Sequence, residues 1–92
     1  MKIHIPTPLR LYTQKQDTVT VDASTVGEAL EKLTLNHPDL KKHLYTGEGK
    51  LRAFVNVYLN DEDIRYLPHG DATPVQEADA LTIIPSIAGG GC

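Results

Sequence analysis

The sequence has little of what an exported or membrane protein would need. Its single cysteine, Cys92, excludes an intrachain disulfide, so nothing indicates an oxidising compartment. No apolar run approaches the length of a membrane span. Pro6 and Pro8 interrupt the apolar residues near the start before a signal-peptide core forms. We therefore expect a cytoplasmic protein that makes no membrane contact.

Positive charge and ligand-binding motifs are also scarce. The formal net charge is −3, and no basic run is longer than Lys41-Lys42, so a nucleic-acid-binding face is not expected. No GxxxxGK[ST] loop is present to hold a nucleotide. The histidines show neither an HExxH pattern nor a helical ligand spacing, since His37 and His43 stand six apart across Pro38. We expect no metal and no cofactor on this chain.

The 92 residues that are present suit one α+β domain. Period-two alternation and flanking turn residues predict short strands at residues 2–5, 18–22, 53–59, 64–66 and 80–84. Residues 60–63 and 68–71 are predicted turns between them. The last strand is apolar on both faces apart from Thr82, which is typical of a strand in the middle of a sheet.

One clear helix follows the second strand. Thr25 and Glu28 have the spacing of a capping box, in which each side chain bonds an exposed amide of the first turn. The next residues carry an apolar stripe formed by Val26, Ala29, Leu30 and Leu33. Pro38 sets the end of this helix, and a short helical turn over residues 38–44 is expected after it.

Strand alternation divides the sheet residues between two faces. Val55, Val57, Leu81 and Ile83 are expected to face the helix. The residues that then lie on the open face are Phe54, Tyr58, Thr82 and Ile84. Aromatic and apolar side chains on an open face often mark a partner-binding surface. The alternative is that crossing loops or the proline-rich stretch near the start cover them.

The C-terminal end is the most informative feature. We expect residues 1–86 to form the domain and residues 87–92 to form a flexible tail, because Gly89, Gly90 and Gly91 lose much backbone entropy on ordering. A tail without Cβ atoms can be threaded into a narrow channel of another protein, where its carboxylate can meet ATP. The alternative is a frayed terminus without function.

Several segments together resemble the MoaD/ThiS family of ubiquitin-like sulfur carriers. The ending Pro-x-Ile-Ala-Gly-Gly, at residues 85–90, resembles the family's C-terminus, and residues 77–80 resemble its acidic turn. Residues 54–65 and 5–10 resemble the CysO-type branch, whose members donate sulfur in cysteine biosynthesis. The resemblance covers nearly the whole chain.

This resemblance implies a β-grasp fold, with a mixed sheet of about four to five strands, one main helix across one face, and the last strand beside the first. It also implies a carrier that is not itself an enzyme. A ubiquitin-activating (E1-like) partner with ATP would adenylate the terminal glycine, and sulfur transfer would make a thiocarboxylate. A pyridoxal-phosphate-dependent cysteine synthase and a zinc-dependent JAMM-type metallopeptidase would be the later partners.

The chain departs from the family pattern at its end. Carriers in their active form end at Gly-Gly, whereas this chain continues with Gly91-Cys92. Alignment of Ala88 with the family's alanine makes Gly90 the sulfur-carrying terminus and Gly91-Cys92 a removable extension. A register one residue later makes Gly91 the terminus instead.

Three other functions fit the same sequence features. The chain can be the small subunit of molybdopterin synthase, or a sulfur carrier for thiamin or a secondary metabolite. It can be a ubiquitin-like protein modifier that is joined to lysines. It can also be a plain interaction domain whose tail takes part in no chemistry.

Overall fold

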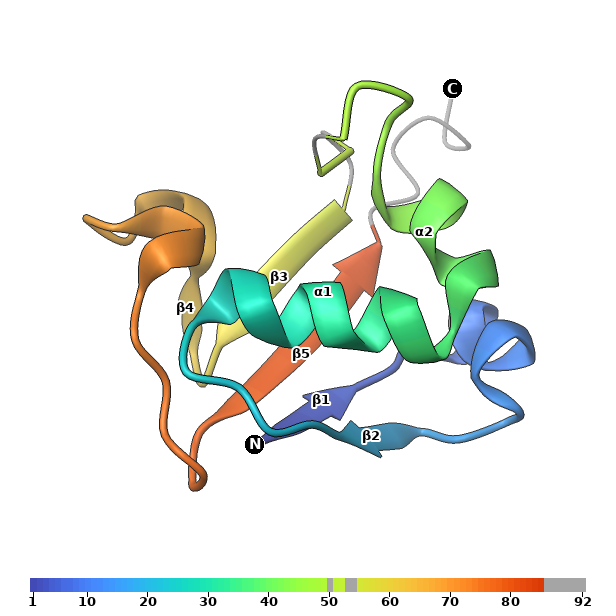
Figure 1. Ribbon diagram of the computed structural model, residues 1–92, viewed down its shortest axis with the longest axis horizontal. Helices are drawn as coiled ribbons and strands as arrows, with labels where there is room; N and C mark the ends of the chain where they lie inside the picture. The colour runs from blue at the N-terminus through green and yellow to red at the C-terminus, as the bar shows by residue number, and fades with distance from the viewer. Residues whose placement is uncertain (50, 53–54, 86–92) are drawn as a thin grey trace.

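The computed structural model describes residues 1–49, 51–52 and 55–85, and within them a five-stranded sheet carries two α-helices on one face (Figure 1). The elements in chain order are β1 (Lys2–His4), the 3-10 helix η1 (Thr7–Thr13), β2 (Thr18–Thr20), α1 (Val26–Asn36), α2 (Pro38–Leu44), β3 (Val55–Leu59), β4 (Glu62–Asp63), the 3-10 helices η2 (Ile64–Tyr66) and η3 (Gly70–Ala72), and β5 (Ala80–Pro85).

The sheet is mixed, with the strand order β2-β1-β5-β3-β4. β5 runs parallel to β1 on one side and antiparallel to β3 on the other. The first and last strands are therefore neighbours, as the family resemblance implies. The central place of β5 confirms the prediction drawn from its apolar residues on both faces.

The core lies between the sheet and α1. Alternation in β3 and β5 turns four side chains toward the helix, and each is at most 1% exposed: Val55, Val57, Leu81 and Ile83. The predicted stripe of α1 meets them and is buried as well: Val26, Ala29, Leu30 and Leu33. Burial of each larger apolar side chain contributes roughly 1.5–3 kcal/mol, so this layer dominates the stability of the domain.

The ends of α1 lie where the sequence predicts them. The hydroxyl of Thr25 accepts a hydrogen bond from the Glu28 N–H at 3.1 Å. The Glu28 carboxylate accepts in return from the N–H of Ser24, at 2.6 Å, rather than from that of Thr25. α1 ends at Asn36, and Pro38 begins α2, which confirms the predicted short helix.

Two predictions for residues 60–66 are wrong. The predicted strand 64–66 is the 3-10 helix η2, while Glu62 and Asp63, which were predicted to be part of a turn, form β4. Asn60 adopts the left-handed conformation, with φ of 56°, and this tightens the turn so that Glu62 pairs with Leu59. The Asp63 carboxylate then caps η2 by accepting from the N–H of Arg65.

The strand predicted over residues 53–59 is confirmed from Val55 onward, whereas residues 53 and 54 lie outside the described part of the chain. The predicted irregular stretch after β1 contains the 3-10 helix η1. Pro8 in its first turn has no N–H to leave unsatisfied, which suits the start of a helix.

The start of β5 is tied to the turn after β3 by Asp79 and Asn60. The Asp79 carboxylate accepts from the N–H of Gln76 at 2.8 Å and from the Asn60 amide at 3.2 Å. Asn60 also exchanges backbone and side-chain hydrogen bonds with Ala80. The Gln76 N–H, and after it the Asn60 amide, hold the pKa of the Asp79 carboxyl below its usual value.

This pKa shift predicts an acid-sensitive contribution to stability. Because the pKa of Asp79 is lower in the folded state, the stabilisation is present above the unfolded value of about 3.9 and is lost as the pH falls through the folded value. In Asp79→Asn, the free energy of unfolding should depend less on pH between about pH 5 and pH 3 than in the wild type. Urea unfolding at several pH values in this range measures the pH dependence of the free energy of unfolding.

The control is Asp61→Asn, which removes an exposed carboxylate from the neighbouring turn and should keep the pH dependence of the wild type. If Asp79→Asn had the same pH dependence as the wild type, Asp79 would have no special part in holding the start of β5.

Candidate functional site

The open face of the sheet brings together most of the predicted partner-binding residues. In the pairing of β5 with β3, Thr82 lies opposite Tyr58, and Ile84 lies opposite Asn56. Tyr58 and Thr82 are half-buried, whereas Ile84 is 46% exposed. Phe54, the fourth predicted member, lies outside the described residues. The predicted alternation of faces is therefore confirmed for the described strands.

The proline-rich stretch does not cover Ile84. It folds into η1, which packs beside α2 on the helix side of the sheet. The Tyr12 ring of η1 stacks on the His43 ring of α2, with 4.2 Å between the ring centroids. Leu9 of the same 3-10 helix is buried in the core. The alternative, in which the proline-rich stretch covers the open face, is thus not supported at Ile84.

The root of the tail lies at the end of β5, where Pro85 pairs with Val55. The predicted tail residues, with the sulfur-carrying terminus and the removable extension among them, lie outside the described residues: Ala88, Gly89, Gly90, Gly91 and Cys92. A groove of about 440 Å³ adjoins Pro85, and its other lining residues are Leu9, Lys42, His43, Arg52 and Val55. The described surface at the tail root is thus apolar with a basic rim.

Arg65 braces this end of the sheet. Its guanidinium donates to the carbonyl oxygens of Arg52 and Val55, at 2.9 and 2.6 Å, and to the Asn56 side chain at 2.7 Å. β4 pairs with Tyr58 and Leu59, so among the described residues no strand lies beside Val55 on that side, and the guanidinium satisfies the Val55 carbonyl instead. The strand that pairs with the tail root is therefore fixed on both sides.

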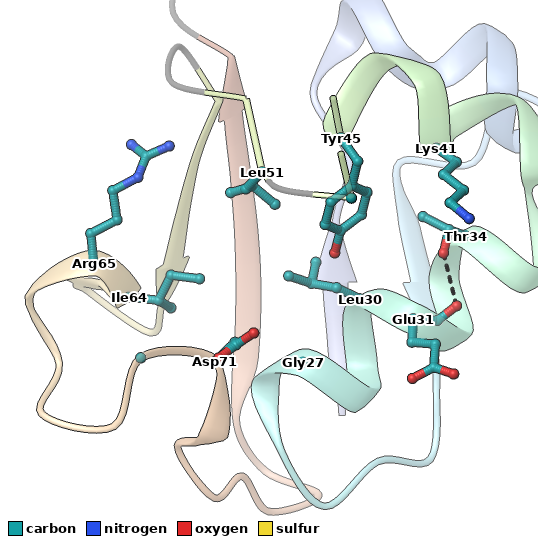
Figure 2. Close-up of a pocket in the computed structure, with 12 residues that line it drawn as sticks. Gly27, Leu30, Glu31, Thr34, Lys41, Tyr45, Leu51, Ile64, Arg65 and Asp71 are labelled. Atoms are coloured by element: carbon teal, nitrogen blue, oxygen red, sulfur yellow. Dashed lines mark hydrogen bonds between the residues drawn. The ribbon is translucent and has the colours of Figure 1, made fainter. Parts of the chain in front are cut away.

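A larger pocket, of about 550 Å³, lies on the helix side of the sheet (Figure 2). Its apolar lining comes from Leu30 of α1, from Leu51 and from Ile64 of η2. η3 closes one side because it packs tightly on the first turn of α1. A Cβ atom at Gly27 would lie 3.1 Å from the carbonyl oxygen of Asp71, so only glycine permits this approach without a shift.

Tyr45 forms the opposite wall of this helix-side pocket. Burial raises the pKa of its hydroxyl, and the carboxylates of Asp71 and Glu31 raise it further. The lining comes from separate segments between residues 27 and 71, so no local motif marked it in the sequence.

Over the ranges that the structure describes, no group of three or more histidine, cysteine, aspartate and glutamate side chains is placed to hold a metal ion. In the same ranges, no helix has both the length and the apolar character needed to cross a membrane. In the acidic run at residues 61–63, Asp61 and Glu62 are exposed, and Glu62 and Asp63 belong to β4 rather than to the predicted turn.

The β-grasp topology and the position of the tail root agree with a family match. The sequence profile of the ThiS family matches residues 3–90. The chain belongs to the ThiS family. Among its relatives, the sulfur carrier protein CysO of Mycobacterium tuberculosis is 39% identical over 90 residues, which cover 96% of each chain.

Two further relatives show the range of this ThiS-family fold. A chain in the crystal structure of the Amycolatopsis orientalis BexX/CysO complex aligns with a TM-score of 0.82 and 38% identity, over 92% of this chain and 93% of that one. Small archaeal modifier protein 1 of Haloferax volcanii is 36% identical over 76 residues, or 79% of this chain and 82% of the relative. The relatives of this chain thus include proteins named as carriers and proteins named as modifiers.

The two faces of β5 predict losses of stability of different size for the same substitution. Ile83 is 1% exposed and Ile84 is 46% exposed. Ile83→Ala should lower the free energy of unfolding by about 2–5 kcal/mol, because it leaves a cavity in the core. Ile84→Ala should lower it by less than about 1 kcal/mol. Urea unfolding of both variants measures this difference, and equal losses would contradict the assigned register.

Proposed function

We propose that this chain carries sulfur as a thiocarboxylate on a C-terminal glycine and donates it in cysteine biosynthesis. The observation that carries the proposal is the 39% identity to CysO over 96% of both chains. The ThiS-family match also runs to residue 90, the residue at which the predicted mature chain ends. Gly90 would therefore bear the sulfur, and Gly91-Cys92 would be removed first.

The chemistry needs an activated carboxylate. One oxygen of the terminal carboxylate attacks the α-phosphate of ATP on an E1-like partner, pyrophosphate leaves, and an acyl-adenylate forms. Sulfide supplied by a donor then attacks the acyl carbon: the new C–S bond forms, the C–O bond to AMP breaks, AMP leaves with the bonding electrons, and the thiocarboxylate remains. In this scheme the chain is a co-substrate and not an enzyme.

The later steps belong to further partners. The thiocarboxylate sulfur attacks an activated serine derivative held by a pyridoxal-phosphate-dependent synthase, and the leaving group departs with the bonding electrons. An acyl shift from sulfur to nitrogen gives a peptide-bonded cysteine, which a zinc-dependent JAMM-type metallopeptidase releases by hydrolysis. The same class of peptidase would trim Gly91-Cys92.

The fold supports this function by separating a rigid body from the reactive end. β5 pairs with β1 as far as Thr82 and with β3 as far as Pro85, so the end of β5 has a defined position relative to the sheet surface that a partner would bind. We propose the open face as the partner-docking surface, with Phe54, Tyr58, Thr82 and Ile84 as its contact residues. Such a surface places the domain while the tail beyond residue 86 enters the partner's channel.

A role as a protein modifier is the second candidate, favoured by the 36% identity to small archaeal modifier protein 1. Carrier and modifier share the adenylate and differ in the product. A modifier ends in an isopeptide bond to a lysine of another protein, whereas a carrier ends in a free thiocarboxylate.

The proposed trimming predicts that chains ending at different residues support ATP–pyrophosphate exchange with different efficiency. A chain that ends at Gly90 should support ATP–pyrophosphate exchange by the activating enzyme, because its carboxylate reaches the nucleotide. The full-length chain should be at least about ten-fold less efficient, a difference of about 1.4 kcal/mol. A chain ending at Gly91 tests the alternative register. Equal efficiency of the full-length and Gly90-ending chains would contradict the need for trimming.

The proposed docking face predicts an effect on recognition. In the Gly90-ending chain, Ile84→Arg should raise the KM for the carrier by about ten-fold with little change in kcat, as expected for loss of an apolar anchor. Leu35→Arg is the matched control, since Leu35 is 70% exposed on α1, away from the open face. If Ile84→Arg and Leu35→Arg changed the KM equally, docking through the open face would be contradicted.

A further inference from the structure

We propose that the groove at the tail root docks an acidic segment of the activating enzyme, in which a carboxylate side chain stands between apolar ones. This tail-root groove is lined by Leu9, Lys42, His43, Arg52, Val55 and Pro85. It lies on the helix side of the sheet, beside α2 and the end of β5 (Figure 1), whereas the proposed docking face is the open side. The inference rests on the proposed function and adds a second contact site to it.

The length of the tail brings the activating enzyme to this groove. Pro85 belongs to the lining and is the last described residue, and the proposed terminus, Gly90, follows it in the sequence after four further residues. An extended chain spans at most about 3.6 Å per residue, so the carboxylate of Gly90 lies within roughly 18 Å of Pro85. A small domain is already about 30 Å across. An enzyme that holds ATP against this carboxylate therefore also faces the residues around Pro85.

The tail-root groove carries positive charge. Its charged lining residues are Lys42 and Arg52, and no aspartate or glutamate belongs to the described lining. The residues outside the described ranges also include no aspartate or glutamate, and the one basic side chain among them is that of Lys50. The terminal carboxylate of the tail lies in the enzyme's channel in the proposed function. Charge complementarity therefore selects a carboxylate on the enzyme's surface.

The fold holds Arg52 in place without neutralising it. Its Nε and Nη2 atoms donate to the carbonyl oxygen of Lys42 at 3.1 and 2.9 Å, and its backbone N–H donates to that of Leu44 at 2.9 Å. Within the described part of the chain, neither Lys42 nor Arg52 forms an ion pair. Both charges thus remain for a partner, and a guanidinium that is already ordered loses less entropy on binding.

The rest of the lining favours a protein segment over a free anion. Leu9 and Val55 are 8% and 1% exposed, and Pro85 adds further apolar surface. A volume of about 440 Å³ accommodates a carboxylate side chain together with an apolar neighbour. A free anion would leave this apolar surface in water, whereas apolar side chains beside the carboxylate would cover it. They would also exclude water from the ion pairs with Lys42 and Arg52, which strengthens them.

The first test is an amide-detected NMR titration of the full-length protein with acetyl-leucyl-glutamyl-leucine amide. Saturable shifts should gather at Leu9, Lys42, His43 and Arg52. The same peptide with glutamine in place of glutamate keeps the shape but loses the charge, and it should bind about five-fold more weakly. Sodium acetate, which lacks the apolar flanks, should also bind more weakly. Shifts spread over the whole surface, or equal binding of either control ligand, would overturn the proposal.

Two adjacent lysines of α2 provide matched variants for the second test. Lys41 and Lys42 are both exposed, but Lys42 lines the tail-root groove and Lys41 does not. In the Gly90-ending chain, Lys42→Glu should raise the KM for the carrier in ATP–pyrophosphate exchange by about ten-fold with little change in kcat. Lys41→Glu makes the same change in net charge and should leave the KM within about two-fold of the wild type. Equal effects of the two variants would overturn the assignment.

The two tests also separate this inference from the proposed function. If the Gly90-ending chain supported exchange but Lys42→Glu and Lys41→Glu did not differ, docking in the groove would be wrong while the carriage of sulfur would stand. If the Gly90-ending chain supported no exchange, the proposed function would fail, whereas selective binding of the glutamate peptide would still support an acidic occupant of the groove. The two-dimensional spectrum of each variant shows directly that the domain is folded.

Discussion

The parallel pairing of β1 with β5 in the middle of the sheet is the constraint on which the rest of the structure depends. Ile3 faces Leu81 across this pair, and both side chains are fully buried beneath the helices. A parallel pair requires a long connection between its strands, and here nearly the whole chain between residues 4 and 80 forms that connection. The core, both helices and the exit of the tail are arranged around it.

In the proposed function, the same constraint gives the domain a rigid sheet from which the sulfur-carrying end would be presented. Because β3 pairs with β5 as far as Pro85, that residue has a defined position relative to the open face and to the groove with a basic rim at the tail root. Arg65 reinforces this because its guanidinium donates to the carbonyl oxygens of Arg52 and Val55 at the start of β3. A partner that recognises the domain would therefore meet Pro85, the last described residue of β5, at a defined place, which suits the proposed function as a carrier whose chemistry is performed by other proteins.

Patterns carried within one element were predictable from the sequence. The alternation in β3 and β5, the cap at Thr25 and the stop at Pro38 are local, and the structure confirms each of them. The short apolar-polar pattern at residues 64–66 fits one turn of a 3-10 helix as well as a strand, and the cap by Asp63 decides between them. A segment of three residues is too short for its hydrophobic periodicity to distinguish a strand from a 3-10 helix.

Features assembled from distant segments were not predictable. The helix-side pocket joins residues from α1, α2, η2 and η3, and its tight wall depends on the approach of Asp71 to Gly27. The brace by Arg65 links η2 to the start of β3, and the bridge between Asn60 and Asp79 links two turns. Such contacts depend on tertiary packing, for which a single sequence holds no periodic signal.

The most direct test of the central claim is the intact mass of this protein isolated from its native cells under mild, thiol-preserving conditions. The account predicts a chain that has lost Gly91-Cys92, with part of the population carrying sulfur in place of one oxygen at the new terminus. A chain that keeps Cys92 in every growth condition, with no sulfur-bearing glycine terminus, would contradict both the trimming and the carriage of sulfur.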